Sequence, residues 1–183
     1  MNVPEHMKAV LLTGHGGLDQ LEYRDDVAVP KLVEGEVLIR VGAAGVNNTD
    51  INTRIGWYSK SISEGTSADG GDDMAEKAES DDATWGGTPL HFPRIQGADV
   101  CGEIVKTSIG SDSGRLGERV LIEPCLRDDL ENQTFGFSYF GSECDGGFAQ
   151  YTKVDSVFAH AVKSDLSDAE LASFPCSYST AEN

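Results

Sequence analysis

Basic residues are scarce in this 183-residue chain, in which 14 Lys and Arg stand against 31 Asp and Glu and the formal net charge is −17. Proteins that bind DNA, RNA or anionic membranes need a basic surface to neutralise phosphate. The composition therefore predicts neither a nucleic-acid nor a membrane partner. The excess of acid fits two explanations: a halophile-like protein kept hydrated by carboxylates in a salt-rich cytoplasm, or an ordinary acidic enzyme with one acidic loop.

Long hydrophobic runs are also missing. No stretch of eighteen apolar residues is present to span a membrane, and the N-terminus MNVPEHMKAV lacks the apolar core of a secretory signal. No C-x-x-C pair is formed by the four cysteines, so a structural zinc knuckle is not expected: Cys101, Cys125, Cys144 and Cys176. A cytoplasmic protein with free thiols is the expectation.

Short β-branched segments bounded by Gly, Asp and Pro are what the sequence does contain. They predict strands at 8–13, 21–29, 36–46, 99–107, 117–123, 147–154 and 157–162. Many short strands with glycine-rich turns are typical of a barrel. The expected fold class is mainly β, a partly open barrel with a few short helices.

Helix signals are few. Thr49 is expected to cap a short helix that runs to about Ile55. Ser167 and Glu170 form a capping-box pattern ahead of a second helix over 169–174, which Pro175 should interrupt.

Residues 59–87 differ from the rest of the chain. They are rich in Ser, Gly, Asp and Ala, and the part from Glu64 to Asp82 holds eight acids and a single base, Lys77. So few large apolar side chains cannot offset the entropy of ordering the backbone. The composition predicts a disordered acidic surface insertion.

Five segments, in order, carry a family resemblance: MKAVLLTGHGG, GEVLIRVGAAGVNNTDINTRIGWY, PRIQGADVCGEIV, GERVLIEP and DGGFAQYTKV. The chain resembles the GroES-like catalytic domain of medium-chain dehydrogenases/reductases, the family of zinc-type alcohol dehydrogenases and quinone oxidoreductases. The resemblance runs from Met7 to the last residue, apart from the acidic insertion, and implies one GroES-like substrate domain over 1–183.

In that family a Rossmann domain with a Gly-rich phosphate turn follows the GroES-like domain. No G-x-G-x-x-G follows a strand here, so we expect the C-terminal nucleotide-binding domain to be missing from this chain and the chain alone to be inactive. By the resemblance, NADPH or NADH is bound mainly by that missing domain. A homo-oligomer, if one forms, is expected to assemble through it.

The resemblance also shows a departure at the family's catalytic zinc site, where a Cys and a His provide soft ligands. Here Asn47 stands in place of the thiolate and Ala98 in place of the imidazole. Asp99 and Cys176 alone remain as candidate ligands, so zinc is not expected. Asp50, whose family counterpart orients the histidine, is then expected to act as a cap or turn residue.

Without zinc, the chain is similar to the zinc-independent quinone reductases, in which the nicotinamide supplies hydride and the protein supplies hydrogen bonds. The implied catalytic residues are Asn47, Thr49 and Tyr58, which would hold the oxygen of a small-molecule substrate. Asn48 and Thr180 are assigned to the cofactor. Structural alternatives stay open: Asn47 could satisfy backbone groups in a turn, Thr49 could be a helix cap, and Tyr58 could anchor the core.

The resemblance implies NAD(P)H-dependent reduction of a carbonyl or an activated double bond. Two alternatives remain: a zinc-dependent alcohol dehydrogenase with atypical ligands, and a stand-alone GroES-like binding or scaffold module. The sequence does not predict the substrate.

Overall fold

The structure is a computed structural model that describes residues 2–61, 82–127 and 137–182. Residues 62–81, the greater part of the insertion predicted at 59–87, lie outside the described residues. The expected disorder of that segment therefore stays a prediction.

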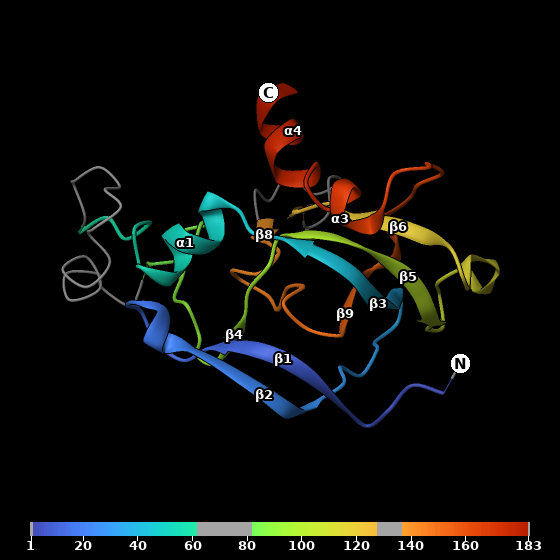
Figure 1. Ribbon diagram of the computed structural model, residues 1–183, viewed down its shortest axis with the longest axis horizontal. Coiled ribbons are helices and arrows are strands. Elements are labelled where there is room, and N and C mark those ends of the chain that lie inside the picture. Colours follow the sequence, from blue (N-terminus) through green and yellow to red (C-terminus); the bar gives the residue numbers. More distant parts are fainter. Residues whose placement is uncertain (1, 62–81, 128–136, 183) are drawn as a thin grey trace.

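Strands dominate the chain, as expected (Figure 1). The strands are β1 (His6–Leu12), β2 (Leu21–Ala28), β3 (Glu36–Gly45), β4 (Arg94–Ile95), β5 (Asp99–Thr107), β6 (Arg119–Ile122), β7 (Cys125–Arg127), β8 (Phe137–Tyr139), β9 (Tyr151–Asp155) and β10 (Ala159–Ala161). The helices are α1 (Asn48–Arg54), α3 (Asp168–Leu171) and α4 (Pro175–Glu182), with short 3-10 turns η1 (Leu18–Gln20), η2 (Ser113–Arg115) and η3 (Ser156–Phe158).

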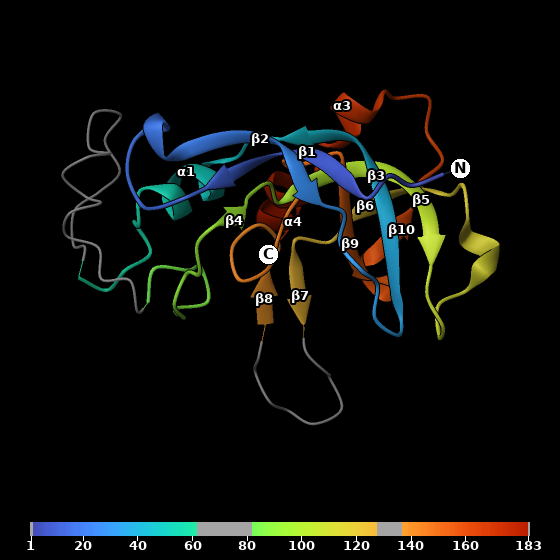
Figure 2. The ribbon, with the colours of Figure 1, turned by 90° about the horizontal axis from the view of Figure 1, so that it is seen from below.

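The strands form three antiparallel sheets that curl around one core. Their orders are β2-β1-β4, β10-β6-β5-β3-β9 and β7-β8. The first two sheets are tied together where Ala9 bridges Ala149 and the Val10 amide donates to the Phe148 carbonyl. Seen from below, the β7–β8 hairpin projects from the curled sheets (Figure 2). The partly open barrel predicted from the sequence is confirmed.

The main core lies inside this curl. Alternation along β6 buries Val120 and Ile122 on one face, as expected for a strand with a single buried side. Phe140, directly after β8, packs into the same cluster. The complete set of buried side chains is Val37, Ile39, Val100, Ile104, Val120, Ile122, Phe140, Val154 and Ala159.

Two predicted strands are only partly correct. The strand expected over 157–162 begins with the turn η3, because the Asp155 side chain accepts a hydrogen bond from the Val157 amide, and only Ala159–Ala161 pairs with β6. The strand expected from Gly147 begins at Tyr151. The preceding residues instead pack against Gly97, with the Gly147 amide donating to the Gly97 carbonyl at 2.8 Å.

The helices at the C-terminus lie beside the end of β3 (Figure 1). The capping box of Ser167 and Glu170 is confirmed at the start of α3. Pro175 begins α4 rather than only interrupting a helix, since proline is well accepted in a first turn, where its missing N–H has no partner to lose. Among the described residues, no helix is long and apolar enough to cross a membrane.

Candidate functional site

The end of β3 and the start of β5 bring the motif residues together. Gly45 pairs with Asp99 across the two strands, so the segment that follows β3 lies beside the segment that precedes β5. Gly97, with φ +101°, allows a close approach, because an added Cβ would lie 2.6 Å from the Phe148 ring. The Asn47 and Ala98 motifs, about fifty residues apart in sequence, therefore share one site.

Asn47 caps α1, which corrects the expectation that Thr49 does so. Asn47 has an extended backbone, and its side-chain oxygen accepts a hydrogen bond from the Thr49 amide at 3.5 Å. The Asp50 carboxylate accepts from the Asn47 amide at 2.8 Å and completes a capping box. The asparagine fits this position because its side chain bonds the free amides of a helix start.

Asp50 is a structural carboxylate at the centre of this turn. It is buried, and its second oxygen accepts from the Gly97 amide at 3.0 Å, which joins α1 to the segment before β5. Burial raises the pKa of the Asp50 carboxyl to about 6, against the lowering effect of its backbone hydrogen bonds. The structure thus places Asp50 as a cap.

Asp99 links Asn47 to Cys176. Its two oxygens accept hydrogen bonds from the Asn47 side-chain amide at 3.3 Å and from the Cys176 backbone amide at 2.6 Å. Burial raises the pKa of the Asp99 carboxyl, and burial likewise raises the pKa of the Cys176 thiol. The four positions that match the family's zinc site therefore lie together: Asn47, Ala98, Asp99 and Cys176. The polar groups of Asn47, Asp99 and Cys176 bond to one another.

Thr49, the second residue of α1, presents a buried hydroxyl to this site. Its Oγ1 atom is buried and finds no partner of good geometry among the described residues. The hydroxyl nevertheless lies near Tyr139 and Cys176, because it partly offsets the rise that burial causes in the pKa of both side chains. An unsatisfied buried hydroxyl costs about 1–3 kcal/mol, so this atom marks a place where a ligand oxygen would complete the site.

Tyr139 is a site residue that the sequence analysis missed. Alternation at the end of β8 directs Phe140 into the barrel core and Tyr139 into a separate cluster with Ala98, Cys176 and Cys125. The phenol donates a hydrogen bond to the Cys176 sulfur at 3.0 Å. The small Ala98 side chain leaves room for this ring. The alternating aromatic pair Phe137 and Tyr139 was the available sequence signal for this strand.

Tyr58 lies in the turn that follows α1. It is half-buried, burial raises the pKa of its phenol, and a hydrogen bond with Asn52 opposes that shift. Its ring meets Trp57 edge-on, with centroids 5.4 Å apart. The negative charges of Cys176, Asp50 and Glu143, when present, would raise its pKa further.

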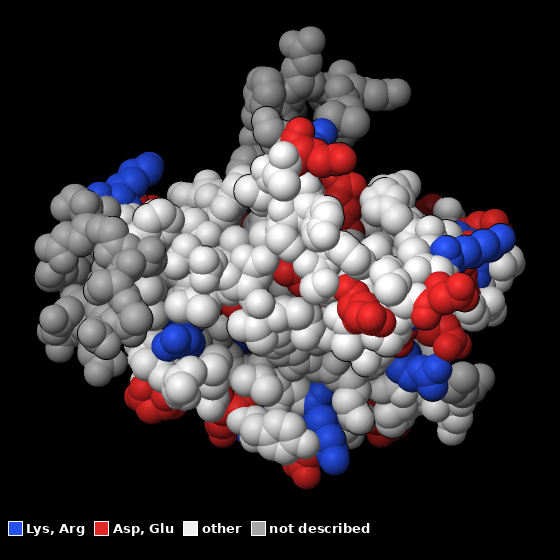
Figure 3. Space-filling view, turned by 45° about the horizontal axis from the view of Figure 1, so that its top comes forward, with Lys and Arg blue, Asp and Glu red and all other residues white. Residues whose placement is uncertain are grey.

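The two residues assigned to the cofactor are exposed. Asn48 is the first residue of α1, and Thr180 lies on α4, where its hydroxyl donates to the Cys176 carbonyl at 2.7 Å. Figure 3 shows the molecule with the top of Figure 1 turned toward the viewer. Charged side chains lie mostly around the rim of this face, and its centre is largely uncharged. Val46, directly after β3, and Tyr178 in α4 are exposed apolar residues close in sequence to Asn48 and Thr180.

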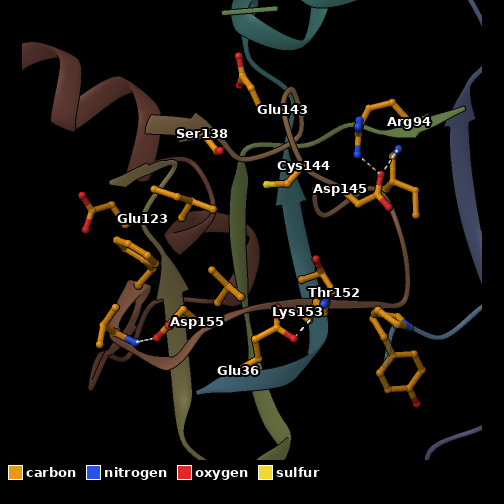
Figure 4. Close-up of a pocket in the computed structure, with 18 of the residues that line it drawn as sticks. Glu36, Arg94, Glu123, Ser138, Glu143, Cys144, Asp145, Thr152, Lys153 and Asp155 are labelled. Carbon is orange, nitrogen blue, oxygen red and sulfur yellow. Dashed lines mark hydrogen bonds and ion pairs between the residues drawn. The ribbon is translucent and has the colours of Figure 1, made fainter. Parts of the chain in front are cut away.

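A cavity of about 920 Å³ opens elsewhere, between β9, the β7–β8 hairpin and the end of β2 (Figure 4). None of the five predicted site residues lines it. Two of its cations are paired with carboxylates: Lys153 with Glu36 and Arg94 with Asp145, each at 2.9 Å. The candidate site is therefore the separate cluster around Thr49.

The donor set does not fit a zinc ion. Asn47 offers a neutral amide and Ala98 a methyl group, while Asp99 uses both oxygens internally. Within residues 2–61, 82–127 and 137–182, no three His, Cys, Asp or Glu side chains lie together as a metal site. Catalytic zinc normally takes three protein ligands and an open position, and this arrangement does not supply them.

Residues 33–164, most of the chain, match the alcohol dehydrogenase GroES-like domain. This chain belongs to that family. It is the GroES-like domain type of the medium-chain dehydrogenases/reductases, as the five sequence segments indicated.

Two curated relatives align over nearly all of this GroES-like domain. The 2-methylene-furan-3-one reductase of Solanum lycopersicum is 30% identical over 181 residues, and the chloroplastic NADPH-dependent alkenal/one oxidoreductase of Arabidopsis thaliana is 26% identical over the same length. Each alignment covers 99% of this chain and 37% of the relative. The chain therefore spans well under half the length of these relatives.

A solved structure confirms the fold. The crystal structure of a "putative alcohol dehydrogenase" from Sinorhizobium meliloti 1021 is 41% identical, with a TM-score of 0.78. It matches 96% of this chain and 45% of its own length.

Proposed function

We propose that this GroES-like domain is the substrate side of an NAD(P)H-dependent oxidoreductase that reduces an activated double bond or a carbonyl without zinc. The observation that carries the proposal is the buried Thr49 hydroxyl, which has no hydrogen-bond partner within the described part of the chain. It lies beside a site whose zinc-ligand positions are filled by an amide and a methyl group. A carbonyl oxygen placed there would receive the missing hydrogen bond.

The names of two relatives support an enone as the substrate class, since one is a furanone reductase and the other an alkenal/one oxidoreductase. An enone accepts hydride at its β carbon, and its oxygen gains negative charge as an enolate forms. Donors already held in place stabilise such charge best in a site from which water is excluded. Thr49 lies in such a buried environment.

NADPH or NADH, when bound, would supply the hydride. Asn48 and Thr180 are the residues of this chain proposed to contact the cofactor, and both are exposed. The uncharged centre of the face shown in Figure 3 supports a second domain packing over it, with the substrate enclosed between the two. Ligand sites commonly occur at such domain interfaces.

The test is an NADPH and NADH oxidation screen of the complete protein against enones, quinones and aldehydes, combined with elemental analysis. We expect enone reduction that survives dialysis against a chelator. Stoichiometric zinc, with activity lost on chelation and regained on adding zinc, would overturn the zinc-independent proposal. A scaffold function would instead show as no nicotinamide oxidation with any of the three classes.

A further inference from the structure

Tyr139 donates its phenolic hydrogen to a poor acceptor. Its hydroxyl lies 3.0 Å from the Cys176 sulfur, and a thiol accepts hydrogen bonds only weakly. The Thr49 hydroxyl, which has no partner of its own among the described residues, lies nearby. Two hydroxyl donors therefore converge on one place, and neither has a strong acceptor there.

Neighbouring residues fix the position of the Tyr139 ring. Trp85 stacks on it with centroids 5.2 Å apart and an interplanar angle of 25°. The Glu143 carboxylate accepts from the Tyr139 amide at 2.8 Å and from the Gly86 amide at 2.6 Å, so it joins the backbone of Tyr139 to the residue that follows Trp85. A donor fixed in this way needs no reorganisation when charge develops in front of it.

We propose that Tyr139 is a catalytic hydrogen-bond donor, which turns its hydroxyl from the Cys176 sulfur to the substrate oxygen and shares that oxygen with Thr49. This inference rests on the proposed function and extends it. Only the hydrogen has to move, by rotation about the phenolic C–O bond, since a charged oxygen is a much stronger acceptor than a thiol.

The electron balance is that of an enone reduction. Hydride forms a new C–H bond at the β carbon, the electrons of the C=C bond shift toward the carbonyl, and the oxygen becomes an enolate. Tyr139 and Thr49 hydrogen-bond to this enolate and keep their own protons. A proton from water then forms the C–H bond at the α carbon, which gives the saturated ketone and oxidised nicotinamide.

The environment of Tyr139 suits a donor that stays protonated. Burial strongly raises the pKa of the phenol, and the hydrogen bond to Cys176 raises it further. Tyr139 is only 5% exposed, so water does not compete for its hydrogen. The phenol therefore remains a donor over the whole pH range in which the fold persists.

The first test is Tyr139→Phe in the complete protein, with a small cyclic enone as substrate. We expect kcat to fall about 100-fold, as for the loss of one oxyanion donor, while the Kd for NADPH is unchanged. Tyr151→Phe is the matched control, because Tyr151 lies in β9 and packs in a different cluster. That control should keep the kcat of the wild type.

The second test does not depend on turnover. Substituted phenolates mimic the enolate, so their binding to the protein with NADP⁺ should weaken about 10-fold or more in Tyr139→Phe. If that variant does not fold, 3-fluorotyrosine placed at position 139 keeps the ring and strengthens the donor, and phenolate binding should tighten.

A folded Tyr139→Phe protein with wild-type kcat and phenolate binding would disprove the role of Tyr139, as would a fluorinated protein that binds phenolates no more tightly. If the wild type reduces no enone, quinone or aldehyde, the proposed function fails. The phenolate comparison still decides the role of Tyr139 in that case.

Discussion

At the scale of single residues, the polar side chains of the site are of two kinds: some make strong hydrogen bonds within the protein, and others do not among the described residues. Asn47 and Asp99 use their side chains to hold α1 and the start of α4 in place. Among the residues that the structure describes, the Thr49 hydroxyl has no partner and the Tyr139 hydroxyl has a weak one. Polar groups that remain unsatisfied at a cost to stability are where function is best sought.

Thr49→Val tests this distinction, because valine has nearly the same shape without the hydroxyl. Losing one donor to the substrate oxygen should lower kcat/KM about 100-fold. Stability should stay the same or rise by up to about 1 kcal/mol, since a buried hydroxyl without a partner is removed. Enone kinetics and urea unfolding of the complete protein measure the two effects.

Thr49→Ser is the control, since serine keeps the hydroxyl and should retain most of the activity. If valine leaves kcat/KM unchanged, Thr49 has no part in the reaction. A loss of stability with valine would show that the hydroxyl has a structural partner after all.

At the scale of elements, the turn between β3 and α1 carries a titrating group. The folded-state pKa of Asp50 is about 6, above its ordinary 3.8. The free energy that this raised pKa contributes to folding is therefore fully present below pH 3.8, and it is lost as the pH rises through 6. Because each pKa unit is worth 1.36 kcal/mol, the free energy of unfolding should fall by about 3 kcal/mol across this window.

Asp50→Asn isolates this effect, since asparagine does not titrate. Relative to the wild type, the variant should gain about 2 kcal/mol between pH 4 and pH 7, because part of the full change already occurs below pH 4. Urea unfolding at several pH values measures the difference. Asp99, whose pKa is also raised, titrates in both proteins, so its effect on the free energy of unfolding largely cancels when the two are compared. If the difference in free energy of unfolding between the two proteins were the same at every pH, the buried-carboxyl interpretation would be wrong.

Gly45, the last residue of β3, sets the distance between that strand and α3. A Cβ at this position would lie 2.5 Å from the Ala172 carbonyl oxygen and 3.1 Å from the Asp99 Cβ. Gly45→Ala should therefore lower the free energy of unfolding by about 1–3 kcal/mol through overpacking. Urea unfolding measures this loss.

Gly114→Ala is the matched control, because its added Cβ would meet only the flexible Asp112 carboxylate, at 3.1 Å. Its effect should stay within about 0.5 kcal/mol. Equal effects of the two substitutions would show that the close contact at Gly45 relaxes without cost.

The elements also show which parts of the fold could be predicted from the sequence. Strands such as β5 were predicted with correct ends, because β-branched alternation marks them clearly. The β7–β8 hairpin, and Tyr139 with it, was missed because these strands are three residues each and their pairing depends on contacts distant in sequence. Asn47 and Ala98 were placed in one site only through the family resemblance. The bond between Tyr139 and Cys176 needed the structure.

At the scale of the whole molecule, the net charge of −17 should govern stability. Like charges repel in the compact state, and added salt screens that repulsion. If the protein is adapted to a salt-rich cytoplasm, unfolding from low to molar KCl should show a gain of at least about 1 kcal/mol, which is about 2–4 °C in Tm.

Thermal unfolding in a KCl series measures this effect. Screening alone should level off at moderate salt, so a Tm that keeps rising toward molar KCl would mark salt adaptation. A flat series from low to high salt would contradict it and favour an ordinary acidic protein.

The side chains around position 98 depend on one another, and this has a consequence for metal binding. Tyr139 fills the space beside Ala98, Asn47 closes the helix cap, and Asp99 bonds to both neighbours. A histidine introduced at 98 alone would overpack the ring, and a cysteine introduced at 47 alone would open the cap. A zinc site could therefore be built here only by several substitutions made together.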